Sequence, residues 1–550
     1  MTDQIEILEA RIAPAVFIVT TLSDTVGSGT LREAINASNG AGGSNTIVFK
    51  AGLHGVLALS GSAALNITNN VTIDGPGAGK VIIDAFGDSQ IFTISASKVT
   101  LSGLGMVHGS ESSGVGGAVY SSGSLTVKNC VIVGSVAEEG GAIFDSGLGT
   151  FTLLNSVISG NQATNGGSGE GGGVYAGMGT AINIIGSKIT GNTSDDLAGG
   201  LRTFLGTGAT GNLVISHSLI SGNSAVGQGG GARMYDESSQ GKVMITNSVV
   251  SGNASGDEGG GIRLYADEPA LIVNTSFIDN TGDANGGGLW VNGFGTFAMT
   301  GGRVSGNSNG GNSGGGVYVG TLLSTVTLTG TTIADNSGDT GGGITIEGGH
   351  LKMTAVTIAE NHSTATAGGL DIFSNIASTK ITGCTIANNV STADAGGVYL
   401  GGSGPITVTA SKITGNKSES AGGGLEINTS SATISLHNNT VSNNAAGGNG
   451  GGLDIENGGT FTITGGSFTG NVSSADGGGI YIGATASGTI MTPGVVITKN
   501  MSSGFGGGVA HDGSASGTVT MKTALVTGNF GPIDVSAKTD TYNTYGDFTV

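Results

Sequence analysis

Cysteine, proline and charged residues are scarce in this chain of 550 residues, and each scarcity excludes a class of protein. The two cysteines, Cys130 and Cys384, lie too far apart in the sequence to indicate a disulfide framework or a metal cluster. Only 6 prolines accompany 110 glycines that follow no every-third spacing, which excludes a collagen helix. Charged residues make up 10% of the chain and apolar residues 37%, a balance that argues against disorder.

Long apolar runs and basic residues are also lacking. No stretch approaches the roughly 18 consecutive apolar residues of a membrane-spanning helix, and the N-terminus lacks the basic and apolar regions of a standard signal peptide. The chain has 19 basic and 38 acidic residues, a formal net charge of −19. Nucleic acids and anionic membranes require a basic surface, so we expect neither as a partner. Cations and neutral or basic surfaces fit this charge better.

The chain is rich in a repeat that is marked by asparagine. Fourteen asparagines recur at spacings of 25 to 31 residues, and the residue three positions before each of them is apolar. Ser135 has the same phase one repeat earlier, which predicts fifteen copies of one unit. The asparagines of this structural ladder are Asn161, Asn192, Asn223, Asn253, Asn280, Asn307, Asn336, Asn361, Asn389, Asn416, Asn444, Asn471, Asn500 and Asn529.

Each repeat also contains a glycine bend and at least two short strands. Apolar residues alternate with others before each asparagine, as at Val326 and Leu328, which is typical of a strand with one buried face. Two or three glycines precede a second alternation, as in GGGL at 450–453. Coils stacked in register would let the asparagine amides bond up and down a column, whereas a propeller would spread them around a ring. The pattern therefore predicts an all-β parallel solenoid, with the asparagines in the left-handed conformation that a sharp bend needs.

Four segments resemble the repeats of a known family. GGAV at 116–119, GGAI at 140–143, FIDN at 277–280 and FTGN at 468–471 are similar to the GGA[ILV] and FxxN repeats of the polymorphic outer-membrane proteins. The passenger regions of that family are right-handed parallel β-helices of bacterial surfaces. The resemblance implies a single right-handed parallel β-helix, for which we count roughly 18 coils.

The N-terminal part of the chain resembles an entry region. The run from Phe17 to Phe49 is similar to segments that precede β-helices in large bacterial surface proteins, and its LREAI segment (31–35) predicts a short capping helix over the first coil. We accordingly expect an N-terminal segment and cap at 1–50, the parallel β-helix at 51–530, and a C-terminal coil or tail at 531–550.

The residue that follows the first apolar residue after each glycine bend is expected to face outward; we call this series the outer column. It includes Arg202, Arg233 and Arg263, which would repel one another on consecutive rungs, followed by Trp290 and Tyr318. One interpretation is a surface network of ion pairs. The other is a groove for an anionic or carbohydrate ligand, in which the arginines bind carboxylate or sulfate and the aromatic rings stack on sugars. The acids closest to the arginines in sequence are Asp195, Asp196, Asp236, Glu237, Asp267 and Glu268.

Acidic residues recur in the loops between the ladder asparagines and the glycine bends. Asp257, Glu258 and Asp283 are the candidates for a calcium site, because calcium favours clustered oxygen ligands. Their irregular spacing does not match the calcium-binding GGxGxD repeat, and a solvated acidic face is the alternative. Calcium is the only cofactor that we consider on these grounds.

Two further features bear on function. Threonines recur at the outward position seven residues before the ladder asparagines, an array similar to the ice-binding surfaces of some β-helical antifreeze proteins; solvated strands also favour threonine. The GHG and RIK motifs of polygalacturonase-like hydrolases are absent from the sequence, and no Ser/His/Asp set can be placed, so we name no catalytic residue.

We therefore predict a non-catalytic structural or adhesive β-helix, secreted or displayed at a cell surface, that binds glycans or surface proteins through a lateral face. One alternative is a polysaccharide lyase or hydrolase that acts on acidic glycans. Another is an extracellular filament that assembles end to end through the terminal coils, or an ice-binding scaffold.

Overall fold

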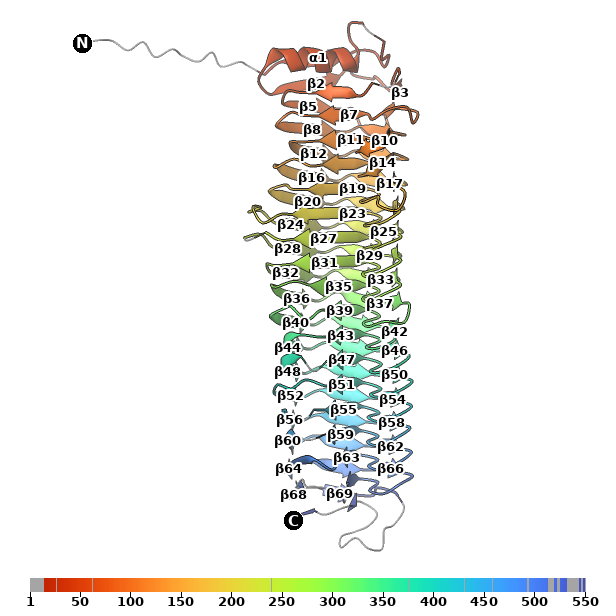
Figure 1. Ribbon diagram of the computed structural model, residues 1–550, viewed down its shortest axis with the longest axis vertical. Helices are drawn as coiled ribbons and strands as arrows, with labels where there is room; N and C mark the ends of the chain where they lie inside the picture. Colours follow the sequence, from red (N-terminus) through yellow and green to blue (C-terminus); the bar gives the residue numbers. More distant parts are fainter. Residues whose placement is uncertain are drawn as a thin grey trace, which may run out of the picture. The chain divides into compact units, whose positions relative to one another are not determined.

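The fold is built from short parallel strands that stack coil upon coil (Figure 1). The computed structural model describes residues 14–549, except for residues 26, 62, 239, 374, 430, 458, 492–493, 513–518, 522–524, 532–543 and 546–547. The chain divides into two compact units, Met1–Gly211 and Asn212–Val550, which we call the first and second units. In most coils the chain passes through four sheets, which we name A, B, D and C in that order, whereas the first coils lack sheet D.

In the first unit, neighbouring strands pair in parallel register, as where Leu153 lies between Val127 and Ile184. Sheet D begins later in the sequence than the other three sheets. The sheets run from β1 (Val16–Val19) to β20 (Ala181–Ile185) in A, from β3 (Gly55–Ala58) to β21 (Lys188–Thr190) in B, from β10 (Ser110–Val115) to β22 (Thr193–Ser194) in D, and from β4 (Leu65–Ile67) to β23 (Leu201–Leu205) in C.

A helix covers the first strands of this unit. Helix α1 (Leu31–Ala41) packs against β1, β2 (Asn45–Phe49) and β4. Its N-cap is Thr30, whose hydroxyl accepts a hydrogen bond from the Glu33 N–H at 3.2 Å. The capping helix predicted from the LREAI segment is therefore confirmed.

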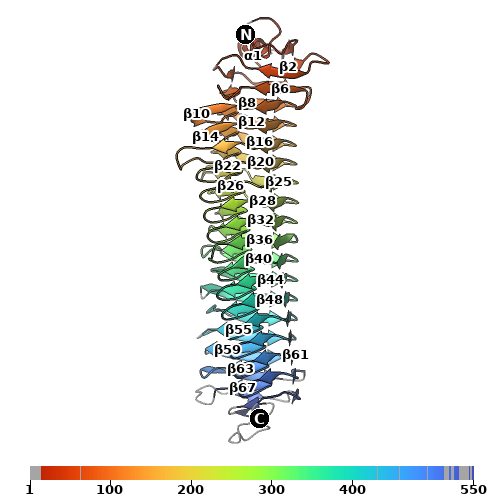
Figure 2. The same cartoon turned by 90° about the vertical axis from the view of Figure 1, so that its right-hand side faces the viewer.

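The second unit repeats one four-stranded coil with little variation. Figure 1 shows the strands of its sheet C in one column, and Figure 2, turned by 90°, shows those of sheet A. One coil comprises β55 (Leu425–Asn428), β56 (Thr433–His437), β57 (Thr440–Ser442) and β58 (Ala445–Ala446). The sheets run from β24 (Leu213–Ser216) to β71 (Phe548–Thr549) in A, from β25 (Leu219–Ser221) to β69 (Leu525–Thr527) in B, from β26 (Ser224–Ala225) to β66 (Met501–Ser502) in D, and from β27 (Ala232–Asp236) to β70 (Thr544–Tyr545) in C.

Apolar side chains fill the interior of the coils in columns. In sheet A of the second unit, Ile272 lies between Ile245 and Met299 on the neighbouring strands, and all three are at most 1% exposed. Burial of one such side chain stabilises the fold by about 1.5–3 kcal/mol relative to an exposed one. The alternation read from the sequence thus marks the core-facing positions.

The ladder asparagines form the predicted column of buried amides within each unit. All fourteen are at most 3% exposed. Asn253 shows the pattern: its backbone N–H and its Nδ2 both donate to Asn280 Oδ1, at 3.1 and 2.8 Å, and Nδ2 also donates to the Ile220 carbonyl at 3.0 Å. Because each amide bonds within the column, the ladder satisfies the polar groups that the bend buries.

The left-handed residue of this bend is the one before each ladder asparagine. Gly252, Asp279 and Glu360 have φ values of 60°, 54° and 58°, and they directly precede Asn253, Asn280 and Asn361. The expectation that the ladder asparagines adopt the left-handed conformation is wrong. Their backbone N–H and side chain are both held in the ladder, so the preceding residue makes the turn.

The glycine bend at 450–452 has glycine at three successive positions for three reasons, although Ala198, Ala367 and Ala395 take the first position with a positive φ in other coils. Gly450 has a φ of 65°, and a Cβ there would lie 2.6 Å from the Asp454 Cβ. A Cβ on Gly451 would lie 2.4 Å from the Val472 carbonyl oxygen, and one on Gly452 would lie 2.9 Å from Asn471 Nδ2. The bend therefore lies in close contact with the outer column on one side and with the ladder on the other.

Parts of two predicted segments fall outside the described residues. These parts are residues 1–13 of the N-terminal segment and, apart from Gly531 and the last two strands, the C-terminal coil at 531–550. Strand β70 pairs in parallel with β67 (Val509–His511), and β71 with β68 (Val519–Met521). Within the described part of the chain, no helix has the length and apolarity to cross a membrane.

Candidate functional site

The outer column is in register within each unit, and most of it is buried. In the second unit, Arg263 pairs with Trp290, Trp290 with Tyr318, and Glu426 with Asp454. Trp290 and Tyr318 are 5% and 8% exposed, and Glu426 and Asp454 are 2% and 1% exposed. The expectation that this column faces solvent is wrong, because the glycine bend of each coil lies against it.

Arg263 is held by internal contacts of the second unit. Its Nε donates to Glu258 Oε2 at 2.8 Å, and its guanidinium lies 4.2 Å from the centre of the Trp290 ring, which stacks on Tyr318 at 6.1 Å. Arg233 Nε donates to Gln228 Oε1 at 3.2 Å. We call Arg233, Arg263, Trp290 and Tyr318 the cationic stretch.

In the first unit, the outer-column arginine also contacts an acidic side chain and an aromatic ring. Arg202 Nε donates to Glu170 Oε2 at 3.0 Å, and its guanidinium lies 5.6 Å from the centre of the Tyr175 ring. Tyr175 stacks on Phe144, with 4.7 Å between ring centres. Like Glu258, Glu170 comes from the loop before a glycine bend, and neither residue is among the acids that the sequence suggested as partners.

The residues predicted to hold calcium engage other groups or stand exposed. Glu258 pairs with Arg263, Asp257 Oδ2 accepts a bond from Gln228 Nε2 at 3.1 Å, and Asp283 is exposed. Among the described residues there is no group of three or more histidine, cysteine, aspartate or glutamate side chains that could hold a metal ion. The geometry of these residues therefore gives no support to a calcium site.

The outer column changes character farther along the second unit. Asp371, Tyr399, Glu426, Asp454 and Tyr481 occupy it in register on successive strands, and we call them the acidic stretch. Glu426 Oε2 and Asp454 Oδ1 are buried, and neither has a hydrogen-bond partner among the described residues. Unlike Arg263, which pairs with Glu258, Glu426 and Asp454 each have another acid on the neighbouring rung.

Burial and like charge raise the pKa of all three carboxyls in the acidic stretch. Burial, then Glu347, raises the pKa of Asp371 to about 7. Burial, then Asp394, Asp454 and Glu456, raises the pKa of Glu426 to about 9. Burial, then Glu456 and Asp394, raises the pKa of Asp454 to about 8. Glu426 and Asp454 are therefore largely protonated at neutral pH, and Asp371 is about half protonated.

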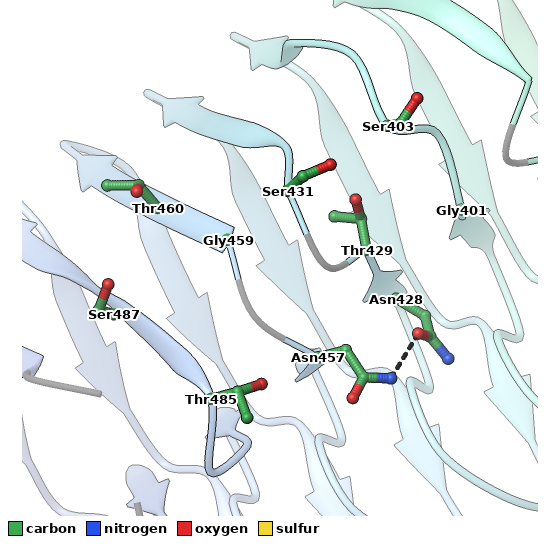
Figure 3. Close-up of a pocket in the computed structure, with 10 residues that line it drawn as sticks. All are labelled: Gly401, Ser403, Asn428, Thr429, Ser431, Asn457, Gly459, Thr460, Thr485 and Ser487. Carbon is green, nitrogen blue, oxygen red and sulfur yellow. Dashed lines mark hydrogen bonds between the residues drawn. The ribbon is translucent and has the colours of Figure 1, made fainter. Parts of the chain in front are cut away.

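A groove of about 770 Å³ lies beside the acidic stretch (Figure 3). It runs over four coils, where strands of sheet C end and strands of sheet A begin, and the lining residues that the structure describes are glycine, serine, threonine and asparagine. Asn428 and Asn457 project from the ends of β55 and β59 (Leu453–Asn457), and Asn457 Nδ2 donates to Asn428 Oδ1 at 2.7 Å. The lining residues are Gly401, Ser403, Asn428, Thr429, Ser431, Asn457, Gly459, Thr460, Thr485 and Ser487.

A β-bulge shapes the middle of this groove. Ile427 pairs with Ile455 and Asn428 pairs with Asn457, so Glu456 is an extra residue of β59. Asn428 Nδ2 donates to Glu456 Oε2, and the Glu456 side chain is exposed. Bulges of this kind redirect side chains, and here the bulge brings Asn457 to the groove.

The predicted threonine array is present on sheet A of the second unit. Thr329, Thr354, Thr382 and Thr409 lie in register on successive strands. His437 follows Thr409 in the same column and is exposed. Because Thr300 also pairs with Thr329, the array is continuous over five strands, and Thr464 follows the interruption at His437.

Comparison with known proteins identifies the family. The model described as "right handed beta helix region" matches residues 85–278, 260–441 and 324–493, which together cover more than half of the chain. The chain belongs to this right-handed β-helix family. The predicted fold class, an all-β right-handed parallel β-helix of about 18 coils with one short helix, is confirmed.

Two solved structures are similar to this chain at low identity. One is the catalytic unit of the thermostable GH87 α-1,3-glucanase from Streptomyces thermodiastaticus strain HF3-3, at 12% identity and a TM-score of 0.30, covering 92% of this chain and 67% of that one. The other is tailspike protein 3 of bacteriophage CBA120, at 11% identity and a TM-score of 0.25, covering 92% of this chain and 59% of that one. No curated protein sequence matches.

Proposed function

We propose that this chain is a non-catalytic, secreted or cell-surface β-helix protein that binds a glycan along the groove of the second unit. The observation that carries the proposal is the composition of the groove, whose ten lining residues are all glycine, serine, threonine or asparagine. Hydroxyl and amide groups donate and accept hydrogen bonds, as sugar hydroxyls do. The rungs repeat about every 4.8 Å, close to the length that one hexose adds to an extended glycan.

The burial of the acidic stretch supports a binding function over catalysis. Hydrolysis of a glycosidic bond generally requires two carboxyls that contact the sugar. Glu426 and Asp454 are 2% and 1% exposed, so neither can reach a glycan in the groove without a rearrangement of the glycine bends. The arginines of the cationic stretch are likewise engaged by Glu258 and Gln228, which disfavours the sulfate or uronate site that the sequence suggested for them.

The proposal is tested by filling the groove. Ser431 and Thr460 line it and are exposed, so Ser431→Trp and Thr460→Trp should block binding without disturbing the core. Thr440 is an exposed threonine on sheet B of the same coil, and Thr440→Trp is the matched control. On an array of oligosaccharides, we expect the unaltered chain and the control to bind a common set of glycans and both groove variants to lose it.

Two outcomes would overturn the proposal. One is binding that survives in both groove variants, which would place the ligand elsewhere. The other is release of shorter sugars or new reducing ends from any bound glycan, which would make the protein a hydrolase or lyase.

A further inference from the structure

The charged side chains of β55 and β59, the two strands that lead into the middle of the groove, are all carboxyls: Glu426, Asp454 and Glu456. None of the ten lining residues is charged. Glu456 lies beside Asn457, is exposed, and bonds to the Asn428 amide. Glu426 and Asp454 occupy the outer column next to the groove, and Asp394 and Glu456 act on both of them. A ligand in the groove therefore lies beside the exposed Glu456 carboxylate, and none of the ten lining residues supplies a cation.

Resting on the proposed function, we propose that the groove selects glycans that carry free amino groups, such as polymers of glucosamine, and rejects glycans that carry uronate or sulfate. Glu456 is the residue that discriminates between ligands by the charge on the sugar. An ammonium group on the sugar gains a charge-assisted hydrogen bond from the Glu456 carboxylate, whereas a carboxylate on the sugar is repelled by it. This ligand class is opposite to the acidic glycans that the arginines suggested in the sequence.

The local geometry prepares Glu456 for this role. The bulge in β59 makes Glu456 an extra residue between two paired positions, and the Asn428 amide holds its Oε2 at the edge of the groove. A carboxylate accepts up to about four hydrogen bonds, so the bond from Asn428 leaves capacity for a ligand. Because Asn428 also receives a bond from Asn457, the carboxylate and two lining amides form one connected group.

The test compares three oligosaccharides of equal length: oligoglucosamine, its fully N-acetylated form, and oligogalacturonate. We expect the order of affinity to be amine, then neutral, then acidic, with about a fivefold preference for amine over neutral, the upper range for an exposed charge pair. The preference should shrink as salt rises toward about 1 M, where the Debye length is about 3 Å. Glu456→Gln removes the charge but keeps a side-chain oxygen that can accept the bond from Asn428. This variant should lose the preference for the amine and still bind the neutral sugar.

The matched control is Glu360→Gln, which removes the same charge from an exposed glutamate at a bend before the ladder. We expect it to keep the preference. The inference fails alone if the neutral sugar binds and the groove variants abolish that binding, yet amine and acidic sugars bind equally well or Glu456→Gln leaves the order unchanged. If none of the three sugars nor any other glycan binds, the proposed function fails and the inference fails with it.

Discussion

Two stretches of one column in the second unit carry opposite charge at equivalent positions. The cationic stretch and the acidic stretch both follow a glycine bend, and both pair strand by strand in sheet C. In the cationic stretch, the charge of Arg263 is neutralised by an ion pair with Glu258. In the acidic stretch, Glu426 and Asp454 have neighbours of their own sign, and burial favours their protonated forms.

The comparison shows that the fold fixes the position and burial of an outer-column residue but not its residue type. The bend fixes where the column residue lies and how deeply it is buried, because Gly450 leaves no room between itself and Asp454. The bend does not determine the residue type, which the chain varies from arginine to aspartate. The groove lies beside the acidic stretch, where the bulge in β59 adds the exposed Glu456 carboxylate to the edge of the groove.

The largest expected effect is a loss of stability of the acidic stretch at alkaline pH. The pKa values of Asp371, Glu426 and Asp454 are raised to about 7, 9 and 8 in the folded chain, whereas unfolded carboxyls ionise near pH 4. Between those values the folded state binds more protons, so the stabilising contribution is complete below about pH 4 and is lost as the pH rises to about 9. One pKa unit corresponds to about 1.4 kcal/mol, so ionisation of Asp371 alone, whose pKa is raised by about three units, costs about 4 kcal/mol.

This prediction is checked by denaturant midpoints of the full chain between about pH 5 and pH 9.5. The variant Asp371→Asn, Glu426→Gln, Asp454→Asn replaces the protonated acids by neutral groups of similar shape. We expect the midpoint of the unaltered chain to fall over this range and that of the variant to change much less. A midpoint of the unaltered chain that stays constant with pH would show that protonation of these carboxyls does not stabilise the fold.

The ladder should contribute equally beside both stretches. Asn280 Oδ1 accepts two bonds from Asn253, and Asn444 Oδ1 accepts two from Asn416. Asn280→Ala or Asn444→Ala would leave two buried donors unsatisfied, each at about 1–3 kcal/mol, so we expect about 3 kcal/mol of destabilisation from either. Both variants are measured by their denaturant midpoints.

The exposed Asn312 provides the control for the ladder, and Asn312→Ala should shift the midpoint little. Nearly equal losses at the two ladder positions are the predicted result. If one ladder variant proved as stable as the control, the ladder would not be a uniform support of the second unit.

The smallest effect concerns the cationic stretch. Arg263→Met removes the bond to Glu258 and the contact with the Trp290 ring, and we expect a loss of about 1–2 kcal/mol. Arg303 pairs with Asp335 at 3.0 Å, but their side chains are 49% and 48% exposed, so Arg303→Met should change the stability by less. Equal midpoints for the two variants would contradict the claim that burial strengthens the Arg263 contacts.

Much of the fold could be predicted from the sequence, because identical residues recur in one phase. The ladder asparagines gave the stacking, and the LREAI segment gave the capping helix, since a short amphipathic run among strands has few other roles. The conformation at the bend was assigned to the wrong residue. Asn253 and Gly252 are adjacent, and the sequence does not tell which of two tolerant residues makes the turn.

The candidate site could be predicted only in part. The outer column was found, but its burial was missed, because the path of the glycine bend against Asp454 leaves no period in the sequence. The groove was missed because the connections from sheet C to sheet A that border it, such as 401–405 and 429–432, differ in length from coil to coil. Strict alternation would have placed Glu456, not Asn457, opposite Asn428, so the bulge also hid the position of Asn457.

The central claim is that the ligand site lies beside the acidic stretch and not on the arginines. A crystal structure of the full chain with an oligoglucosamine bound would test it most directly. The account predicts electron density for the sugar along Asn428, Ser431 and Asn457, with an amino group against Glu456. Density over Arg233 and Arg263 instead, or on the threonine face of sheet A, would contradict it.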